Sequence, residues 1–383
     1  MLDLCRQRTL EFCKRLAAND IPLAIITDQS SIAYLAGFWG YLSVEFGRPT
    51  CLVLRPDQEP VVVTPLMESE MVGRMTWIKQ IRTWTDAGAT RWDSVLRQEF
   101  GAAAPVIGIE TGTIPAIVRS WLGETYPNAK IVDAATVLGG MRMIKAPEEI
   151  DIMRKAGQIA AAMMAAAHGA LKEGAPEYEA ALAVINAGTR KAAGFLTQSG
   201  WDAFISPMIH NLQIMQSGRD TTMVHRRASV RRMERGDPVY FCFCNMVEFK
   251  HYRLGFDRMF FIGEASEEAA HVQNTAVAAQ QAALASIREG VVAEDVAAAA
   301  NEVYQRAGFE PGYRTGRSIG VSYLEAPELK EGDKTVLKPG MTFAVDGGIS
   351  VPGKGGGRIG DSIVVTKSGF EYLTDYPRGL LIA

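Results

Sequence analysis

The spacing of apolar residues in the first third of the chain alternates between helical and strand-like periods. An apolar stripe at near-helical spacing predicts a helix over residues 3–19. Further helices are expected at residues 30–35, 67–75 and 91–100. Short apolar runs that end at polar turns predict strands at residues 21–27, 51–54, 60–63, 81–84 and 106–110. This alternation predicts an α/β domain over residues 1–138.

The rest of the chain, residues 139–383, combines longer helices with apolar hairpins. Ala-rich amphipathic segments predict helices at residues 148–172, 176–194, 264–289 and 293–307. They alternate with strand-rich stretches at 195–262 and 341–366. The pattern predicts an α+β domain with its helices on one side of an antiparallel sheet. A length of 383 residues also favours two domains.

Composition and charge narrow the class of protein. Hydrophobic residues make up 48% of the chain and the formal net charge is -3, which is ordinary for a soluble protein and gives no support for nucleic-acid binding. We find no apolar run of membrane-spanning length, so no membrane partner is expected. The five cysteines follow neither a disulfide framework nor a zinc-binding spacing. A reducing, cytoplasmic location is the simplest expectation.

Candidate chemistry concentrates in the stretch from Ser217 to Gly263. His225 lies in a polar, arginine-rich segment, and two apolar runs that follow it predict paired strands. Asp257 stands where the second of these strands begins. A histidine on a loop and a carboxylate at a strand entrance are the groups that acid–base catalysis needs. A structural histidine on an ordinary hairpin is the alternative.

Several strings, taken together and in order, resemble the creatinase/prolidase superfamily, which has the pita-bread fold of peptidase family M24. They are Arg142-Met-Ile-Lys-Ala-Pro-Glu-Glu, Gly236-Asp-Pro-Val, Asp257-Arg-Met-Phe-Phe-Ile-Gly, Leu337-Lys-Pro-Gly-Met-Thr-Phe and Arg358-Ile-Gly-Asp-Ser-Ile-Val-Val-Thr. The resemblance covers nearly the whole chain. It implies a creatinase-type α/β N-terminal domain followed by an α+β pita-bread catalytic domain.

Most members of that superfamily are dinuclear metallopeptidases whose ligands are two Asp, one His and two Glu. The corresponding positions here are Cys244, Gly255, Arg317, Asp346 and Gly360. One of the five keeps a carboxylate, and a divalent ion needs at least three anionic or imidazole ligands. The chain therefore resembles the non-metal branch, which includes creatinase and ectoine hydrolase, and we expect no metal and no other cofactor.

The resemblance to that branch implies catalytic roles for three residues. His225 corresponds to the general acid/base, while Asp257 and Asp346 correspond to two carboxylates that face the substrate's guanidinium. The two aspartates also have plainer interpretations. Asp257 could form an ion pair with Arg258, and Asp346 could cap a turn. Arg317 either fills the former metal position with positive charge or binds substrate.

Substrate-binding residues follow from the same resemblance. Phe46 and Arg48 are similar to a string that reaches a neighbouring subunit's site, which implies a homodimer whose N-terminal domain contributes to that site. Arg314 corresponds to a second arginine for the substrate carboxylate, although Arg48 is equally compatible with an ordinary surface arginine. Trp39 and Phe46 are candidates to pack on a flat cation, and Tyr252 is a further substrate-binding candidate.

These residues predict a metal-independent hydrolase that cleaves a C–N bond in a small zwitterion. Such a substrate carries an amidine or guanidine at one end and a carboxylate at the other, as creatine and ectoine do. Two alternatives stay open. The first alternative is a catalytically inactive binding protein on the same fold. The second is a metal-dependent Xaa-Pro peptidase or lyase whose ligands lie at other positions.

Overall fold

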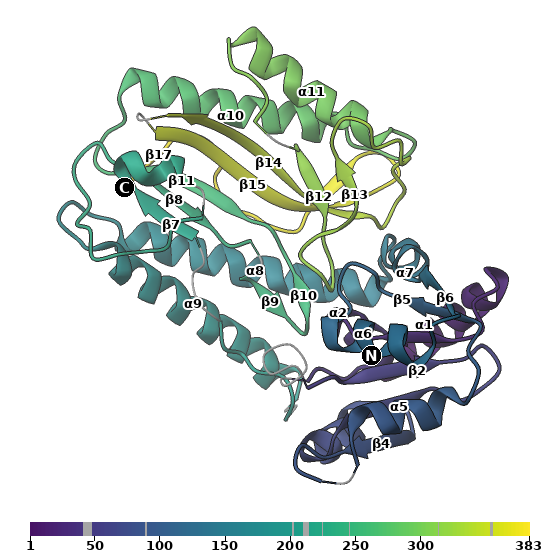
Figure 1. Cartoon of the computed structure of the whole chain (residues 1–383). Coiled ribbons are helices and arrows are strands. Elements are labelled where there is room, and N and C mark those ends of the chain that lie inside the picture. Colours follow the sequence, from purple (N-terminus) through teal and green to yellow (C-terminus); the bar gives the residue numbers. More distant parts are fainter. Residues whose placement is uncertain are drawn as a thin grey trace. The chain divides into compact units, whose positions relative to one another are not determined.

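The computed structural model describes most of the chain, and its contacts divide it into two compact units, Met1–Met141 and Arg142–Ala383 (Figure 1). The described residues are 1–40, 48–88, 90–200, 203–209, 214–223, 225–244, 246–312, 314–352 and 355–383. The boundary expected from the sequence, after residue 138, falls just before this division. Among the described residues, no helix is long and apolar enough to cross a membrane.

Within the described part of the first unit, six strands pair in the order β4-β3-β2-β1-β5-β6. They are β1 (Ala24–Ile26), β2 (Cys51–Leu54), β3 (Val61–Pro65), β4 (Gln80–Trp84), β5 (Val106–Ile109) and β6 (Lys130–Asp133). Strand β2 is antiparallel to both of its neighbours, whereas the other pairs are parallel. This is the α/β arrangement that the alternating pattern predicts.

Helices pack against this sheet through apolar side chains. They are α1 (Leu2–Ala18), α2 (Gln29–Ala36), the 3-10 helix η1 (Leu66–Glu68), α4 (Ser69–Met75), α5 (Trp92–Phe100), α6 (Ala116–Thr125) and α7 (Ala135–Arg142). Trp121 of α6 lies at the centre of one core, with ring centroids 5.6 Å from Phe100 and 5.8 Å from Tyr126. Burying these rings together removes a large apolar area from water, which stabilises the unit.

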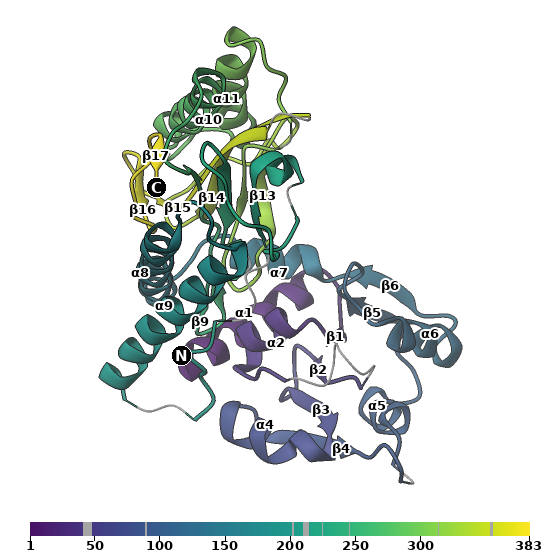
Figure 2. The ribbon, with the colours of Figure 1, turned by 90° about the vertical axis from the view of Figure 1, so that its left-hand side faces the viewer.

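The second unit is built on a larger sheet with the strand order β13-β12-β14-β15-β11-β8-β7, in which β16 also pairs with β15 and β17 with β11 (Figures 1 and 2). Its strands are β7 (Ile214–Ser217), β8 (Pro238–Cys242), β11 (Asp257–Phe261), β12 (Gly316–Ser318), β13 (Glu325–Leu329), β14 (Thr342–Val351), β15 (Gly355–Val365), β16 (Phe370–Tyr372) and β17 (Leu381–Ile382). A separate pair is formed by β9 (Glu248–Phe249) and β10 (Tyr252–Arg253).

Helices of the second unit begin where local sequence signals favour them. They are α8 (Pro147–Ala170), α9 (Glu177–Gln198), the 3-10 helix η2 (Gly218–Thr222), α10 (Glu267–Ser286) and α11 (Ala293–Arg306). Pro147 occupies the first turn of α8, and Glu149 accepts a hydrogen bond from the N–H of Ala146 at 2.8 Å. Ser266 caps α10 by accepting from the N–H of Ala269.

The long helices α8 and α10 contact one face of the large sheet. Gln280 of α10 donates to the carbonyl of Val345 at 3.1 Å, and a Cβ on Gly347 would overlap the carbonyl oxygen of Ala276. His168 of α8 lies with its ring 4.8 Å from that of Phe260 in β11. Side chains alternate between the two faces along a strand. Asp346 is one residue before Gly347 in β14, so it points away from α10. Asp257 is three residues before Phe260 in β11, so it likewise points away from α8. The predicted α+β layer arrangement is therefore confirmed, and it leaves these carboxylates on the face away from α8 and α10.

Candidate active site on the open face of the large sheet

One row of paired residues crosses the large sheet and organises the site. Ile214 pairs with Cys242, Cys242 with Asp257, Asp257 with Gly360, and Gly360 with Asp346. Directly opposed residues in antiparallel strands point to the same face. The row therefore brings Asp257 and Asp346, which are far apart in the sequence, to either side of a glycine.

Arg317 of β12 joins this row from the next strand. Its Nη1 donates to Asp346 Oδ2 at 2.6 Å, its Nη2 donates to Cys244 Sγ at 3.0 Å, and its guanidinium lies 4.4 Å from the centre of the Tyr323 ring. Arg317 and Asp346 are only 3% and 6% exposed. A buried charge is stable in such a site only when it is paired, so each group of this ion pair depends on the other.

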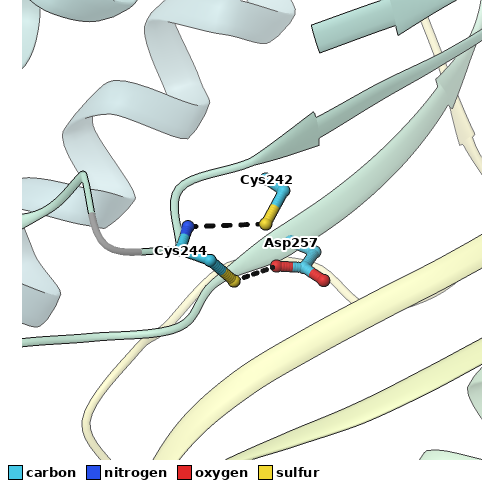
Figure 3. Close-up of side chains that lie close together, drawn as sticks. All are labelled: Cys242, Cys244 and Asp257. Carbon is cyan, nitrogen blue, oxygen red and sulfur yellow. Dashed lines mark hydrogen bonds between the residues drawn. The ribbon is translucent and has the colours of Figure 1, made fainter. Parts of the chain in front are cut away.

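Two cysteines surround the second carboxylate, Asp257 (Figure 3). Cys244 Sγ donates to Asp257 Oδ1 at 3.3 Å, and the Tyr240 hydroxyl donates to Oδ2 at 2.9 Å. Cys242 Sγ accepts from the N–H of Cys244 at 3.4 Å. One donor atom from each of Cys242, Cys244 and Asp257 lies within 4.8 Å of the others. The carboxylate is thus held by a hydroxyl and a thiol rather than by a cation.

The two carboxylates converge on Gly360, which has no side chain to separate them. A Cβ at this position would stand 2.8 Å from Asp346 Oδ1 and 2.9 Å from Asp257 Cγ. Asp346 Oδ1 has no hydrogen-bond partner among the described residues. A buried carboxylate oxygen without a donor is costly, so this oxygen faces a place where a ligand N–H would be favourable.

The burial and the charges of the site shift its pKa values. Burial, together with the nearby Asp257 carboxylate, raises the pKa of Asp346 to about 6, although Arg317 and Arg314 act in the opposite direction. Burial alone would lower the pKa of Arg317, but Asp346 and its other partners outweigh burial and raise it. Burial and the neighbouring Cys244 and Asp257 raise the pKa of the Cys242 thiol. At neutral pH Asp346 is therefore a carboxylate paired with the Arg317 guanidinium.

His225 lies on the segment that follows η2, beside the edge strand β7. The carbonyl of the next residue, Arg226, accepts from the N–H of Met215 at 3.2 Å. This hydrogen bond places the segment that contains His225 next to β7, whose residue Ile214 is the first member of the row of paired residues that includes both aspartates. The His225 side chain is exposed, and no hydrogen bond or ion pair joins it to either aspartate in the described part of the chain. Its predicted catalytic role stays a prediction.

A buried carboxylate anchors the His225 segment. Glu177, at the start of α9, accepts from Arg226 Nη2 at 2.5 Å and Nη1 at 3.0 Å, from Ser217 Oγ at 2.6 Å and from Ser229 Oγ at 2.7 Å. Burial alone would raise the pKa of Glu177, but these hydrogen bonds outweigh it and hold the pKa below its usual range. The sequence carries no signal for this role, because a glutamate in the first turn of a helix is common.

The predicted substrate-binding residues lie in different surroundings. Arg314 pairs with Glu328 at 3.2 Å, and its charge acts on Asp346. The Tyr252 hydroxyl donates to Glu149 Oε1 at 2.8 Å. In the first unit, Arg48 pairs with Asp86 at 3.0 Å and Trp39 is half-buried, while Phe46 lies outside the described residues. The contribution of Phe46, Arg48 and Trp39 to a neighbouring subunit's site stays a prediction.

The two plainer interpretations of the aspartates are wrong. Arg258 forms its ion pair with Asp361, at 2.9 Å, rather than with the Asp257 carboxylate. Asp346 lies inside β14 and not at a turn. The spacing of Cys242 and Cys244 predicts side chains on one face of a strand, as the structure has them. Tyr240 was missed, although its alternation with these two cysteines along the strand indicates the same face.

The five positions that correspond to metal ligands in the resembling superfamily come together here, and they do not fit a metal. Arg317 donates to the other two that carry polar side chains, Cys244 and Asp346. A Cβ on Gly255 would stand 2.8 Å from Arg317 Nη2. The guanidinium thus lies among the former ligand positions, where its positive charge opposes a divalent cation.

Comparisons with known proteins place the chain in a family. A model described as metallopeptidase family M24 matches residues 151–367, and one described as the creatinase/prolidase N-terminal domain matches residues 8–144. The chain belongs to metallopeptidase family M24. It contains both parts that the sequence predicts, a creatinase-type N-terminal domain and a domain with the pita-bread fold of this enzyme family.

Its relatives carry different activities in their names. This chain is 31% identical over 363 residues to an agropine synthesis cyclase of Rhizobium rhizogenes, with 90% of this chain and 89% of the relative covered. It is 28% identical over 391 residues to a creatinase of Bacillus sp. strain B-0618, with 97% and 91% covered. An ectoine hydrolase of Halomonas elongata is 25% identical over 385 residues, with 96% and 94% covered.

Peptidases are similar to this chain as well. The crystal structure of dipeptidase PepE from Mycobacterium ulcerans matches with a TM-score of 0.83 and 26% identity, covering 100% of this chain and 98% of that chain. A dipeptidase, a creatinase and an ectoine hydrolase thus all occur among the proteins similar to this chain. The choice between them depends on the residues of the site.

Proposed function

We propose that this M24 protein is a metal-independent hydrolase of a C–N bond in a small amidine or guanidine that also carries a carboxylate. The observation that carries the proposal is that the carboxylates of Asp257 and Asp346 converge over Gly360, where no side chain separates them. An amidinium is planar and presents N–H donors on both sides. Bound to this pair of carboxylates, it would satisfy the unpartnered Asp346 Oδ1 and form charge-assisted hydrogen bonds to both groups.

The charge of the cluster favours a cationic ligand. It offers two aspartate side chains and the guanidinium of Arg317, which contacts Asp346, so a cationic group can bind beside the aspartates. A neutral peptide bond brings no such charge, and it would also need a metal or another electrophile to stabilise the oxyanion. An amidinium already carries its own positive charge and needs only an activated nucleophile at carbon.

Arg317 supports metal independence. A divalent ion bound between Cys244 and Asp346 would have to displace a guanidinium that already donates to both. We propose that Arg317 supplies the fixed positive charge that keeps Asp346 ionised in a buried site. His225 would move a proton between water and the leaving nitrogen, and Arg314, together with Arg48 from a neighbouring subunit, would bind the substrate carboxylate.

A direct assay tests the proposal. Purified protein is incubated with creatine, ectoine and hydroxyectoine, with and without a chelator, and its metal content is measured. We expect turnover of at least one compound, unchanged by the chelator. Stoichiometric zinc, manganese or iron in an active preparation would contradict metal independence. A ligand that raises the melting temperature without forming product would instead indicate a binding protein.

The agropine synthesis cyclase relative favours a second candidate, a ring-closing reaction. Hydrolysis of a cyclic amidine run in reverse also closes a ring, so the same site would serve either direction. The assay is therefore repeated from the open-chain products. Ring closure without measurable hydrolysis would favour the cyclase.

Adding a side chain at Gly360, where the two carboxylates converge, is expected to weaken binding of the cationic ligand. Gly360→Ala puts a methyl group within 3 Å of both carboxylates, so we expect the KM for an amidine substrate to rise about tenfold or more. Steady-state kinetics and circular dichroism measure the effect on binding and on the fold. Gly194→Ala is the matched control, because a Cβ there meets no atom within 4 Å. An unchanged KM in Gly360→Ala would rule out this position for the ligand.

A further inference from the structure

We infer that the thiol of Cys244 is the nucleophile that attacks the amidinium carbon. This inference rests on the proposed function and adds a covalent step to it. Cys244 lies in the cluster that contains both carboxylates, and it is 6% exposed. Among the five cysteines, all of which are free, it is the thiol that contacts both Asp257 and Arg317.

The two partners of Cys244 are those that a reactive thiol requires. Asp257 Oδ1 accepts from Sγ at 3.3 Å and is positioned to take its proton. Arg317 Nη2 donates to Sγ at 3.0 Å and would stabilise the thiolate that forms.

A second, independent observation points to a ligand beside this thiol. Asp346 Oδ1 is buried, has no hydrogen-bond partner among the described residues and lies against Gly360. The Asp257 carboxylate also lies against Gly360, and it contacts Cys244 Sγ. A cationic head that satisfies Asp346 Oδ1 would therefore lie beside the carboxylate that takes the thiol proton.

The covalent step balances without any further reactant. Asp257 takes the proton of Cys244, and Sγ forms a bond to the amidinium carbon while the C=N electron pair moves to nitrogen. The scissile C–N bond then breaks, and the leaving nitrogen receives the proton. Water adds to the carbon that is now bound to sulfur, the C–S bond breaks, and the thiol is restored. The sum is the addition of one water across one C–N bond.

Alkylation of the unmodified protein tests the inference without any need for turnover. Chloroacetamidine is a cation and chloroacetamide is its neutral analogue; each forms an S–C bond and releases chloride. The alkylated cysteine is identified by mass spectrometry of the digested protein. We expect the cation to alkylate Cys244 at least about tenfold faster than the neutral reagent, and Gly360→Ala to abolish this preference. Equal rates with the two reagents, or alkylation of Cys242 as fast as of Cys244, would overturn the inference.

Variants separate this inference from the proposed function. Cys244→Ala and Cys244→Ser are compared with Cys51→Ser, which changes a buried thiol in the other unit. If the unmodified protein hydrolyses a test compound and both Cys244 variants keep its rate, Cys244 is not the nucleophile, and the proposed function stands. If no compound is hydrolysed but the cation still alkylates Cys244 selectively, the proposed function fails and the reactive thiol is supported.

Discussion

Replacing His225 with alanine is expected to lower kcat by about 10²–10⁴-fold while leaving the fold intact. The His225 side chain is exposed and makes no hydrogen bond or ion pair with the described residues, so its removal should cost little stability. Any large loss of activity would therefore come from the missing proton transfer. Steady-state kinetics and thermal unfolding of the same preparation measure the two effects separately.

A matched histidine makes this comparison specific. His271 is also exposed and lies on α10, where its ring centroid is 6.0 Å from that of Phe309. His271→Ala should keep the rate of the unmodified protein. Added imidazole should restore part of the activity of His225→Ala, because a small base can enter an exposed position. A near-normal rate in His225→Ala would show that His225 is not the general acid/base.

Replacing Arg317 with methionine is expected to lower the free energy of unfolding by about 3–5 kcal/mol. The variant leaves Asp346 buried without its partner at 2.6 Å, and it removes the donor to Cys244 Sγ. Chemical denaturation measures the loss. Arg306→Met is the control, since its pair with Glu302 is exposed and should contribute little.

The pH dependence of Arg317→Met follows from Asp346. The pKa of Asp346 is raised to about 6 even with Arg317 present, and loss of that arginine would raise it further. A carboxyl whose folded pKa lies above its unfolded value stabilises the fold at low pH and loses this contribution as the pH rises through the folded pKa. The variant should thus be least destabilised below pH ~4. Arg317→Met/Asp346→Asn should recover much of the lost stability at neutral pH, and failure to do so would contradict a buried ion pair.

Most long elements of the fold could be predicted from the sequence. The helices α8 and α10 follow from Ala-rich amphipathic runs, and the β14–β15 pair from apolar segments of strand length. The strands β7 and β12 could not be found in this way. Gln216 and Ser217 are polar although fully buried, and β12 has only three residues, so neither strand shows an apolar alternation.

The site was predictable only in part. The resemblance identified the five former ligand positions, and the structure brings them together. It could not show that the Arg317 guanidinium reaches Cys244, because this contact depends on the register between β12 and β14 and on the absence of a side chain at Gly255. The convergence of the two aspartates likewise depends on which residues pair with Gly360, and pairing across a sheet is not encoded locally.

The row from Ile214 to Asp346 also links ligand binding to the completion of folding. Each of its members comes from a different strand, and a slip of one residue in any strand would turn that member's side chain to the opposite face. A partly folded chain would therefore lack the proposed binding site. A ligand that binds the two aspartates would stabilise the folded state of the whole unit, because the pairing of all five strands positions those two side chains.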